Sequence, residues 1–312
     1  MSPRECVQAV GLAFCEHGMQ QVGVMPREIL WADPDDAEPR SRALKLSAAY
    51  MRESKVMGGS IYAVHFTPGS VDMWLTIFDG VTGQMLGIIN GKILSVWKTA
   101  ATAAVAARAL ARANSRNMAL IGTGSYAFAQ LAFLKSVMDI AQVRCFSRNS
   151  ERLAAFCAMA SRSLGIDVAP AASAAVAVQD ADIVTTITTS PRPVLLGQWL
   201  PAGVHCNIMG QHAPAAREVD TAAVTGARVF VDSMAQAMNE KGEILMPISE
   251  GAMSDDRIAG ELGSVLAGTC VGRTGDAERT MFCSGGTAFE YMSLCALLLE
   301  RAKAAEIGTT LT

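Results

Sequence analysis

Residues 117–128, which read NMALIGTGSYAF, join an apolar run, a glycine turn and the start of an amphipathic pattern. The run at 118–121 is typical of a buried strand, and from Phe128 onward apolar residues recur at helical spacings of three and four. A strand, a G-x-G-x-x-A turn and a helix in that order predict the phosphate-binding turn of a dinucleotide site. The first glycine permits the tight turn, the second lets a pyrophosphate come close, and the small third residue allows helix and strand to pack. The alternative is an ordinary tight turn between a strand and a helix. The candidate cofactor-binding residues of this turn are Gly122, Thr123, Gly124, Ser125, Tyr126 and Ala127.

Beyond this turn, strand-like apolar runs alternate with helical patterns. Strands are expected at 143–146, 183–186, 204–208 and 229–231, and helices near 126–138, 149–164, 172–180 and 219–225. Strands that alternate with helices form parallel βαβ units. The pattern therefore predicts an α/β fold, with a Rossmann-type doubly wound parallel sheet in a dinucleotide-binding domain at 115–286.

The flanking segments have a different pattern. A helix is expected within 1–25, an extended segment at 24–31, and short strands between 43 and 89 that are separated by turn signals, as in an antiparallel meander. A long alanine-rich helix is expected at 95–113 and a final helix at 287–304. These segments predict a second, α+β domain made of residues 1–114 and 287–312.

Composition excludes several classes of partner. The 312-residue chain is 51% apolar and 18% charged, with a formal net charge of −3, so it has no basic footprint for nucleic acid. No basic-then-apolar leader opens the chain, and no uncharged apolar stretch is long enough to predict a membrane helix. The eight cysteines contain no C-x-x-C pair and the four histidines are scattered, which predicts free thiols and no metal site. A cytoplasmic protein is expected.

The residues at the end of the second strand of such a sheet select the cofactor. A carboxylate there holds the ribose 2′-hydroxyl of NAD, whereas an arginine accommodates the 2′-phosphate of NADP. Here the segment 145–150 reads CFSRNS and has no carboxylate, and Arg148, with Ser147 and Asn149, is suited to bind a phosphate. The sequence thus favours NADP(H), with NAD(H) possible. The alternative is a solvated Arg148 beside a Ser147 that caps the next helix.

Polar residues follow three later strands, at the edge of the sheet where ligands bind. The hydroxyl run TTITTS at 185–190 contains Thr186 and Thr188, and the run IMGQH at 208–212 contains Met209 and Gly210; we expect these four residues to contact the cofactor. Asp232 directly follows the apolar run at 229–231, where burial can tune a carboxylate for proton transfer. The alternative for Asp232 is an N-cap of the helix that follows.

In this order the motifs resemble the ornithine cyclodeaminase/μ-crystallin family over nearly the whole chain. The matching segments are MPRE at 25–28, LSAAYM at 46–51, FDGVTGQMLGIINGKIL at 78–94, KTAATAAVAARALA at 98–111, IGTGSYA at 121–127, ADIVTTITTSPRPVLLGQWLPAGVHCNIMG at 181–210, REVD at 217–220, VFVDSMAQAMNEKGEIL at 229–245, ELGSVLAG at 261–268 and FCSGGTA at 282–288. The resemblance implies a homodimer in which the Rossmann domain is inserted between an N-terminal substrate-binding and dimerisation part and a returning C-terminal helix. It also implies a small amino or imino acid as substrate.

The resemblance further assigns roles to individual residues. Arg27 matches the family's first carboxylate-binding arginine, and Asp232 matches its catalytic aspartate. Lys98, in the segment KTAA, stands where the family has a second carboxylate-binding arginine, and we expect it to act in both binding and catalysis. Its charge is kept, but the planar fork of the arginine is lost.

Two further positions depart from the family pattern. Tyr62 aligns with the family's pocket lysine and is expected to contact substrate, while Lys55 is nearby in sequence but lies before the Gly58-Gly59 turn. Tyr291 stands where the family often has an aspartate, and the loop that follows the pocket strand is shortened to residues 70–72. These changes bear on the substrate and leave the dinucleotide motif intact.

Two hypotheses follow from the resemblance. The first is an NAD(P)-dependent enzyme acting at the Cα of a small amino or imino acid, by ornithine cyclodeamination, imine reduction or amino-acid dehydrogenation. The second is a binding protein of the μ-crystallin type that has lost catalysis and binds the dinucleotide and a ligand. His65 and His212 are candidates to replace the missing proton carrier, although a lone histidine near a cleft is more often structural.

Overall fold

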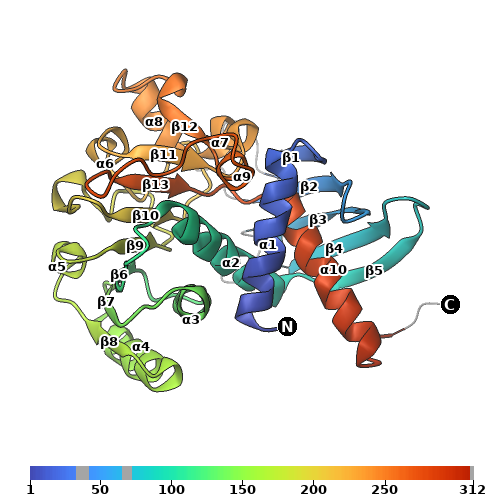
Figure 1. The fold of residues 1–312 in the computed structure, drawn as a ribbon, viewed down its shortest axis with the longest axis horizontal. Helices are drawn as coiled ribbons and strands as arrows, with labels where there is room; N and C mark the ends of the chain where they lie inside the picture. Colours follow the sequence, from blue (N-terminus) through green and yellow to red (C-terminus); the bar gives the residue numbers. More distant parts are fainter. Residues whose placement is uncertain (33–41, 65–71, 310–312) are drawn as a thin grey trace.

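The computed structural model describes residues 1–32, 42–64 and 72–309. Two sheets organise the chain (Figure 1). The first is an antiparallel sheet of five strands in sequence order, as the meander pattern predicts: β1 (Val22–Trp31), β2 (Ala43–Met51), β3 (Val56–Val64), β4 (Asp72–Asp79) and β5 (Met85–Asn90). The shortened loop expected at 70–72 lies mostly outside the described residues, as does His65.

One face of this sheet packs against the C-terminal helix. The helix α10 (Ala288–Ala304) crosses the sheet and contacts strands β1 to β4, and α1 (Pro3–Gly18) lies beside it (Figure 1). The other face carries exposed apolar side chains. Met25, Ile61, Trp74 and Ile88 are each 42–48% exposed.

The second sheet has eight parallel strands in the order β12-β11-β13-β10-β9-β6-β7-β8. Its strands are β6 (Asn117–Ile121), β7 (Gln142–Phe146), β8 (Asp167–Pro170), β9 (Ile183–Thr186), β10 (His205–Ile208), β11 (Arg228–Val231), β12 (Ile258–Glu261) and β13 (Thr280–Cys283). The predicted Rossmann-type fold is therefore confirmed. Strands β8, β12 and β13 were not predicted; β8 ends in a proline and β12 contains a glycine, and neither residue is typical of a strand interior.

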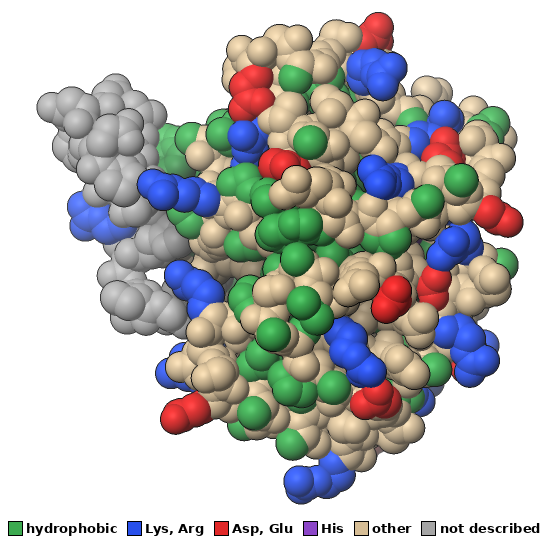
Figure 2. Space-filling model, turned by 90° about the vertical axis from the view of Figure 1, so that its left-hand side faces the viewer, with side chains coloured by type: hydrophobic (Ala, Val, Ile, Leu, Met, Phe, Trp, Pro, Cys, Tyr) green, Lys and Arg blue, Asp and Glu red, His purple; other side chains and the backbone are tan. Residues whose placement is uncertain are grey.

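Helices connect and cover these strands. They are α2 (Lys92–Leu110), α3 (Ala127–Val137), α4 (Ser150–Leu164), α5 (Ala174–Val178), α6 (Thr221–Thr225), α7 (Met234–Glu240), α8 (Gly242–Ser249) and α9 (Leu262–Leu266), with short 3₁₀ turns η1 (Gly197–Trp199) and η2 (Asp255–Arg257). A view onto the end of the molecule that carries α5 and α6 shows apolar side chains along the middle of that face. Basic and acidic side chains are interspersed around them (Figure 2).

Helix α2 joins the two sheets. It contacts α1, α3, α10 and β10, and its alanines allow these elements to approach closely. By length and apolar composition alone α2 could cross a membrane, which corrects our reading that no stretch is long enough. In this fold 61% of that segment is buried inside the protein, as in a core helix. One continuous apolar core therefore runs from the five-stranded sheet through α2 to one face of the parallel sheet.

Candidate active site

The glycine turn lies between β6 and α3, as predicted. Gly122 has φ +104°, and a Cβ there would stand 2.6 Å from the carbonyl oxygen of Ile187, so only glycine fits. A Cβ on Gly124, in contrast, would meet no protein atom within 4 Å. Helix α3 begins at Ala127, which is fully buried, and no side chain caps it. The turn thus combines open space with an uncapped helix N-terminus, and this arrangement fits a pyrophosphate.

The predicted 2′-phosphate region follows β7. The Thr123 hydroxyl donates to the Ser147 hydroxyl at 3.0 Å, which ties the glycine turn to this region. Asn149, and not Ser147, caps α4, because its side-chain oxygen accepts a hydrogen bond from the amide of Arg152 at 2.8 Å. Arg148 is exposed and forms no hydrogen bond or ion pair with any described residue. Its guanidinium is therefore available to a phosphate.

The ends of β9 and β10 are held together by a carboxylate that sequence reasoning missed. Fully buried Glu218 accepts hydrogen bonds from the Thr186 hydroxyl at 2.9 Å, from the Thr188 hydroxyl and amide at 2.7 Å, and from the Gly210 amide at 2.6 Å. Met209 is buried in the core. The threonine hydroxyls that we expected to face a cofactor thus donate to Glu218 and fix the loops at this edge. The motif REVD contains Glu218, but no local pattern distinguishes it from a surface residue.

Asp232 follows β11 and is fully buried. Its Oδ2 accepts hydrogen bonds from the Ser284 hydroxyl at 3.1 Å and the Gly286 amide at 2.5 Å, and its Oδ1 accepts one from the Ser233 amide at 2.9 Å. Ser233 is the N-cap of α7, so the capping alternative for Asp232 is wrong. Burial, and then the negative charge of Glu290, raise the pKa of Asp232 to about 6, although the Gly286 amide and two lysines oppose the shift. Such a carboxyl can exchange a proton near neutral pH.

The loop after β13 lies between Asp232 and two cationic side chains, Arg27 and Lys98. Gly286 has φ +78°; its carbonyl oxygen accepts a hydrogen bond from Nη2 of Arg27 at 2.9 Å, and its amide donates to Asp232. A Cβ on Gly286 would stand 2.5 Å from Nζ of Lys98. Arg27, Lys98 and Asp232 therefore meet at this glycine. The motif FCSGGTA contained it, but the position of β13 between β10 and β11 could not be read from the sequence.

Both predicted carboxylate-binding cations are paired with buried glutamates. Arg27 donates through Nη1 to Glu240, and Nζ of Lys98 lies 2.9 Å from Oε2 of Glu290. Glu290 also accepts hydrogen bonds from the Thr102 hydroxyl at 2.5 Å and from the amide and hydroxyl of Thr287, so its carboxylate is held on several sides. Neither glutamate was predicted, because pairing across the chain leaves no local signal.

Aromatic hydroxyls join the pocket to the glycine turn. Nζ of Lys98 lies 5.1 Å from the ring centre of Tyr291. The Tyr291 hydroxyl donates to Ser95 at 3.1 Å, and the Ser95 hydroxyl lies 3.0 Å from that of Tyr126 in the glycine turn. Tyr62 is half-buried on β3, and burial raises its pKa to about 12, so its hydroxyl stays protonated at neutral pH. The residues expected to bind substrate and those expected to bind cofactor are thus physically connected.

His212 lies close to this cluster. Its pKa is well below the usual value of a histidine, because of burial and then the positive charges of Lys241, Arg27, Lys45 and Lys98. Its Nδ1 atom is buried without a hydrogen-bond partner among the described residues. The imidazole is therefore neutral at neutral pH and lies near these cations. His65 lies outside the described residues.

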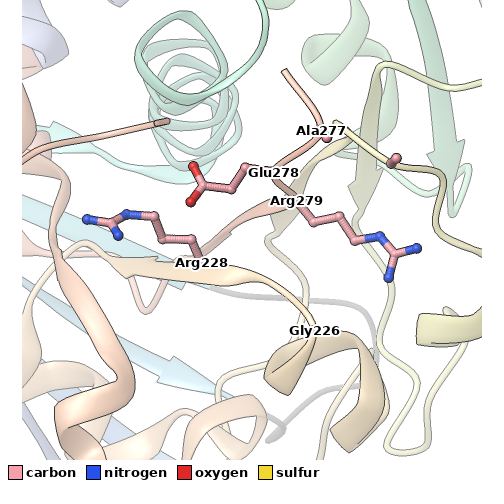
Figure 3. A pocket seen from close by; sticks show the side chains of 6 residues that line it. Gly226, Arg228, Ala277, Glu278 and Arg279 are labelled. Atoms are coloured by element: carbon pink, nitrogen blue, oxygen red, sulfur yellow. The ribbon is translucent and has the colours of Figure 1, made fainter. Parts of the chain in front are cut away.

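A hollow elsewhere on the molecule is not part of this site. It lies at the start of β11 and just before β13, which is the opposite edge of the sheet from Asp232 (Figure 3). The guanidinium groups of Arg228 and Arg279 point away from each other there, and they donate to the carbonyl oxygens of Val271 at 3.0 Å and Leu200 at 2.5 Å (Figure 3). Both arginines are therefore engaged within the protein.

The fold and the site together define a class of protein: a dinucleotide-binding enzyme whose Rossmann-type sheet lies beside a cluster of buried charges. Comparison with known proteins narrows this class. The model of the Ornithine cyclodeaminase/mu-crystallin family matches residues 43–306, and the chain belongs to this family.

Three similar proteins illustrate the family. A Delta(1)-pyrroline-2-carboxylate reductase of Colwellia psychrerythraea strain 34H is 33% identical over 238 residues, which cover 76% of this chain and 75% of that one. The structure of Thermococcus litoralis Delta(1)-pyrroline-2-carboxylate reductase in complex with NADH and L-proline matches with a TM-score of 0.93 and 29% identity, over 100% of this chain and 96% of that one. An archaeal alanine dehydrogenase dimer with bound NAD matches with a TM-score of 0.91 and 25% identity, over 100% of this chain and 95% of that one.

Proposed function

We propose that this protein is a nicotinamide-dependent reductase that converts the C=N bond of a small α-imino acid into the C–N bond of an α-amino acid. The observation that carries the proposal is the meeting of Asp232, Arg27 and Lys98 at Gly286. It lies at the same edge of the parallel sheet as the glycine turn, since the carboxyl ends of parallel strands share one edge. The reductases and the dehydrogenase among the relatives support this reading over a binding protein without activity.

Different side chains of the site bind the substrate and transfer the proton. Arg27 and Lys98 are placed to bind the α-carboxylate through charge-assisted hydrogen bonds, which orients the imine carbon. Asp232 is placed to give a proton to the imine nitrogen as that nitrogen becomes an amine. A bound nicotinamide dinucleotide would supply the hydride to Cα. Burial of these groups excludes water and strengthens each electrostatic interaction.

We further propose that NADPH is preferred over NADH. The segment 145–150 at the end of β7 has no carboxylate, and Arg148 is exposed and forms no ion pair with any described residue at the place expected for a 2′-phosphate. The relatives with bound cofactor hold NADH or NAD, so they support a nicotinamide dinucleotide without supporting this preference.

We also propose a homodimer formed through the outer face of the five-stranded sheet. The exposed side chains of Met25, Ile61, Trp74 and Ile88 line that face, and the apolar area they present is typical of a covered interface. The alanine dehydrogenase relative is a dimer. Sedimentation of the purified chain should give twice the monomer mass of 32.8 kDa, and a monomer at micromolar concentration would contradict the proposal.

Oxidation of NADPH, followed at 340 nm, tests the proposed reaction. The panel comprises pyrroline-2-carboxylate and pyruvate with ammonia or methylamine, each measured with NADPH and with NADH. It also includes L-ornithine, measured with NADP⁺ and with NAD⁺. We expect one cyclic or linear imine to be reduced, with a lower KM for NADPH than for NADH. Formation of proline from ornithine would instead assign the lyase reaction. Tight cofactor binding without turnover of any substrate would favour a binding protein, and NADH binding tenfold tighter than NADPH would refute the preference.

A further inference from the structure

The buried cations of the pocket are already neutralised. Arg27 pairs with Glu240, Lys98 pairs with Glu290, and Lys241 pairs with Glu243 at 3.1 Å. All six side chains are at most 7% exposed. Three such pairs contribute little net charge. An anionic substrate that enters this pocket loses its hydration, and neutral pairs compensate that loss poorly.

Lys45 is a further cation near these pairs, and it has no ion pair with any described residue. Lys45 lies on β2 directly opposite Tyr62 on β3, in the register that also pairs Lys45 with Ile29 on β1. Alternation along the strand puts Lys45 on the same face as Ser47 and Ala49, which are buried beneath the sheet.

The electrostatic surroundings of Lys45 agree with this placement. Burial and then the charge of Arg27 lower the pKa of Lys45, and Glu240 opposes the shift. Lys45 and Arg27 also both depress the pKa of His212. Among the described residues Lys45 makes no ion pair and no hydrogen bond. Lys45 is therefore on the face of the sheet that carries Tyr62 and close enough to Arg27 and His212 to interact with both electrostatically.

We propose that Lys45 gives the substrate pocket its net positive charge and binds the α-carboxylate of the substrate together with Arg27. This inference rests on the proposed function and extends it, since it assigns a binding residue that the sequence comparison did not indicate. It also explains how a tyrosine is tolerated at position 62. The two side chains stand opposite each other on neighbouring strands, so an ammonium from either strand enters the same space.

The substitution Lys45→Met removes the charge and keeps the aliphatic stem. We expect KM for the imine substrate to rise about 10- to 100-fold, as for loss of a charge-assisted hydrogen bond, with kcat changed less than about threefold. NADPH affinity should be unchanged. Lys55→Met is the matched control, because Lys55 is exposed in the turn between the same two strands and carries the same charge. It should leave KM as in the wild type.

A double variant separates binding from structure. In the double variant Lys45→Met/Tyr62→Lys, the ammonium comes from the opposite strand. We expect at least half of the increase in KM, on a logarithmic scale, to be reversed. A merely structural role of Lys45 would not be rescued in this way. An unchanged KM in Lys45→Met, in an enzyme whose wild type turns over, overturns the inference and leaves the proposed function standing.

If no imine of the panel is reduced, calorimetry tests whether Lys45 binds a carboxylate. The ligands are L-proline and pyruvate, each titrated in the presence of NADP⁺. Either carboxylate should then bind the wild type at least tenfold more tightly than Lys45→Met. Equal affinity, or no binding to the wild type, overturns the inference.

Discussion

Replacement of Asp232 by asparagine should reduce turnover of the imine substrate by roughly 10²- to 10⁴-fold, the usual loss when a general acid is removed. Asparagine keeps the shape of the side chain, and its oxygen can still accept the hydrogen bond from the Gly286 amide. The expected effect on chemistry therefore exceeds the effect on stability, which comes from the lost hydrogen bond of the Ser233 amide. Stopped-flow measurement of hydride transfer at saturating NADPH gives the rate, and the dissociation constant of NADPH should stay within about twofold of the wild type.

The pH dependence gives this prediction a sign. The pKa of Asp232 lies above the ordinary aspartate value, at about 6, so the acid form persists to higher pH than in an exposed aspartate. Imine reduction consumes the acid form, and its kcat/KM should fall as pH rises above about 6. Oxidation of the amino acid consumes the base form, and its kcat/KM should fall as pH drops below about 6.

Glu290→Gln is the control that assigns the fall in kcat/KM near pH 6, called here the pH limb, to Asp232. The negative charge of Glu290 is the second cause of the raised pKa of Asp232, after burial. Glutamine removes that charge and can still accept the hydrogen bond from the Thr287 amide in the capping box. The limb should therefore move to lower pH in this variant. A full rate in Asp232→Asn, or a limb that stays in place in Glu290→Gln, would show that another group carries the proton.

Local sequence patterns were sufficient for the framework of this site. The switch from a strand period to a helical period around Gly122 and Gly124 located the glycine turn between β6 and α3, because a period is carried by residues that are adjacent in the chain. Asp232 was found for a similar reason, since it follows an apolar strand. The motif resemblance added Arg27 and Lys98, which the fold brings to one glycine.

Non-local pairing determined what the sequence could not predict. Gly286 becomes the meeting point of Arg27, Lys98 and Asp232 only because β13 enters the sheet between β10 and β11. Glu218 holds the ends of β9 and β10 for the same kind of reason, so the hydroxyls of Thr186 and Thr188 are engaged within the protein. Charged residues at such positions resemble surface residues until their partners are placed.

The substitution Gly124→Ala should weaken dinucleotide binding by roughly 10- to 100-fold and leave the fold intact. The protein tolerates a Cβ at residue 124, because an added Cβ would have no non-neighbouring atom within 4 Å and Gly124 does not have a positive φ. The added methyl group would project into the space beside the N-terminus of α3, where the pyrophosphate is expected to lie against the backbone. Titration of NADPH fluorescence gives the affinity, and thermal unfolding gives the stability.

Two other glycines separate cofactor binding from backbone strain. A Cβ on Gly275 would also meet no atom within 4 Å, and Gly275 has no positive φ, so Gly275→Ala should change neither affinity nor Tm. Gly122→Ala should lower Tm, because its φ is +104° and the methyl group would meet the carbonyl of Ile187 at 2.6 Å. If Gly124→Ala binds NADPH as tightly as the wild type, the pyrophosphate does not rest on this turn. The hydride donor would then lack the anchor that places it near Asp232.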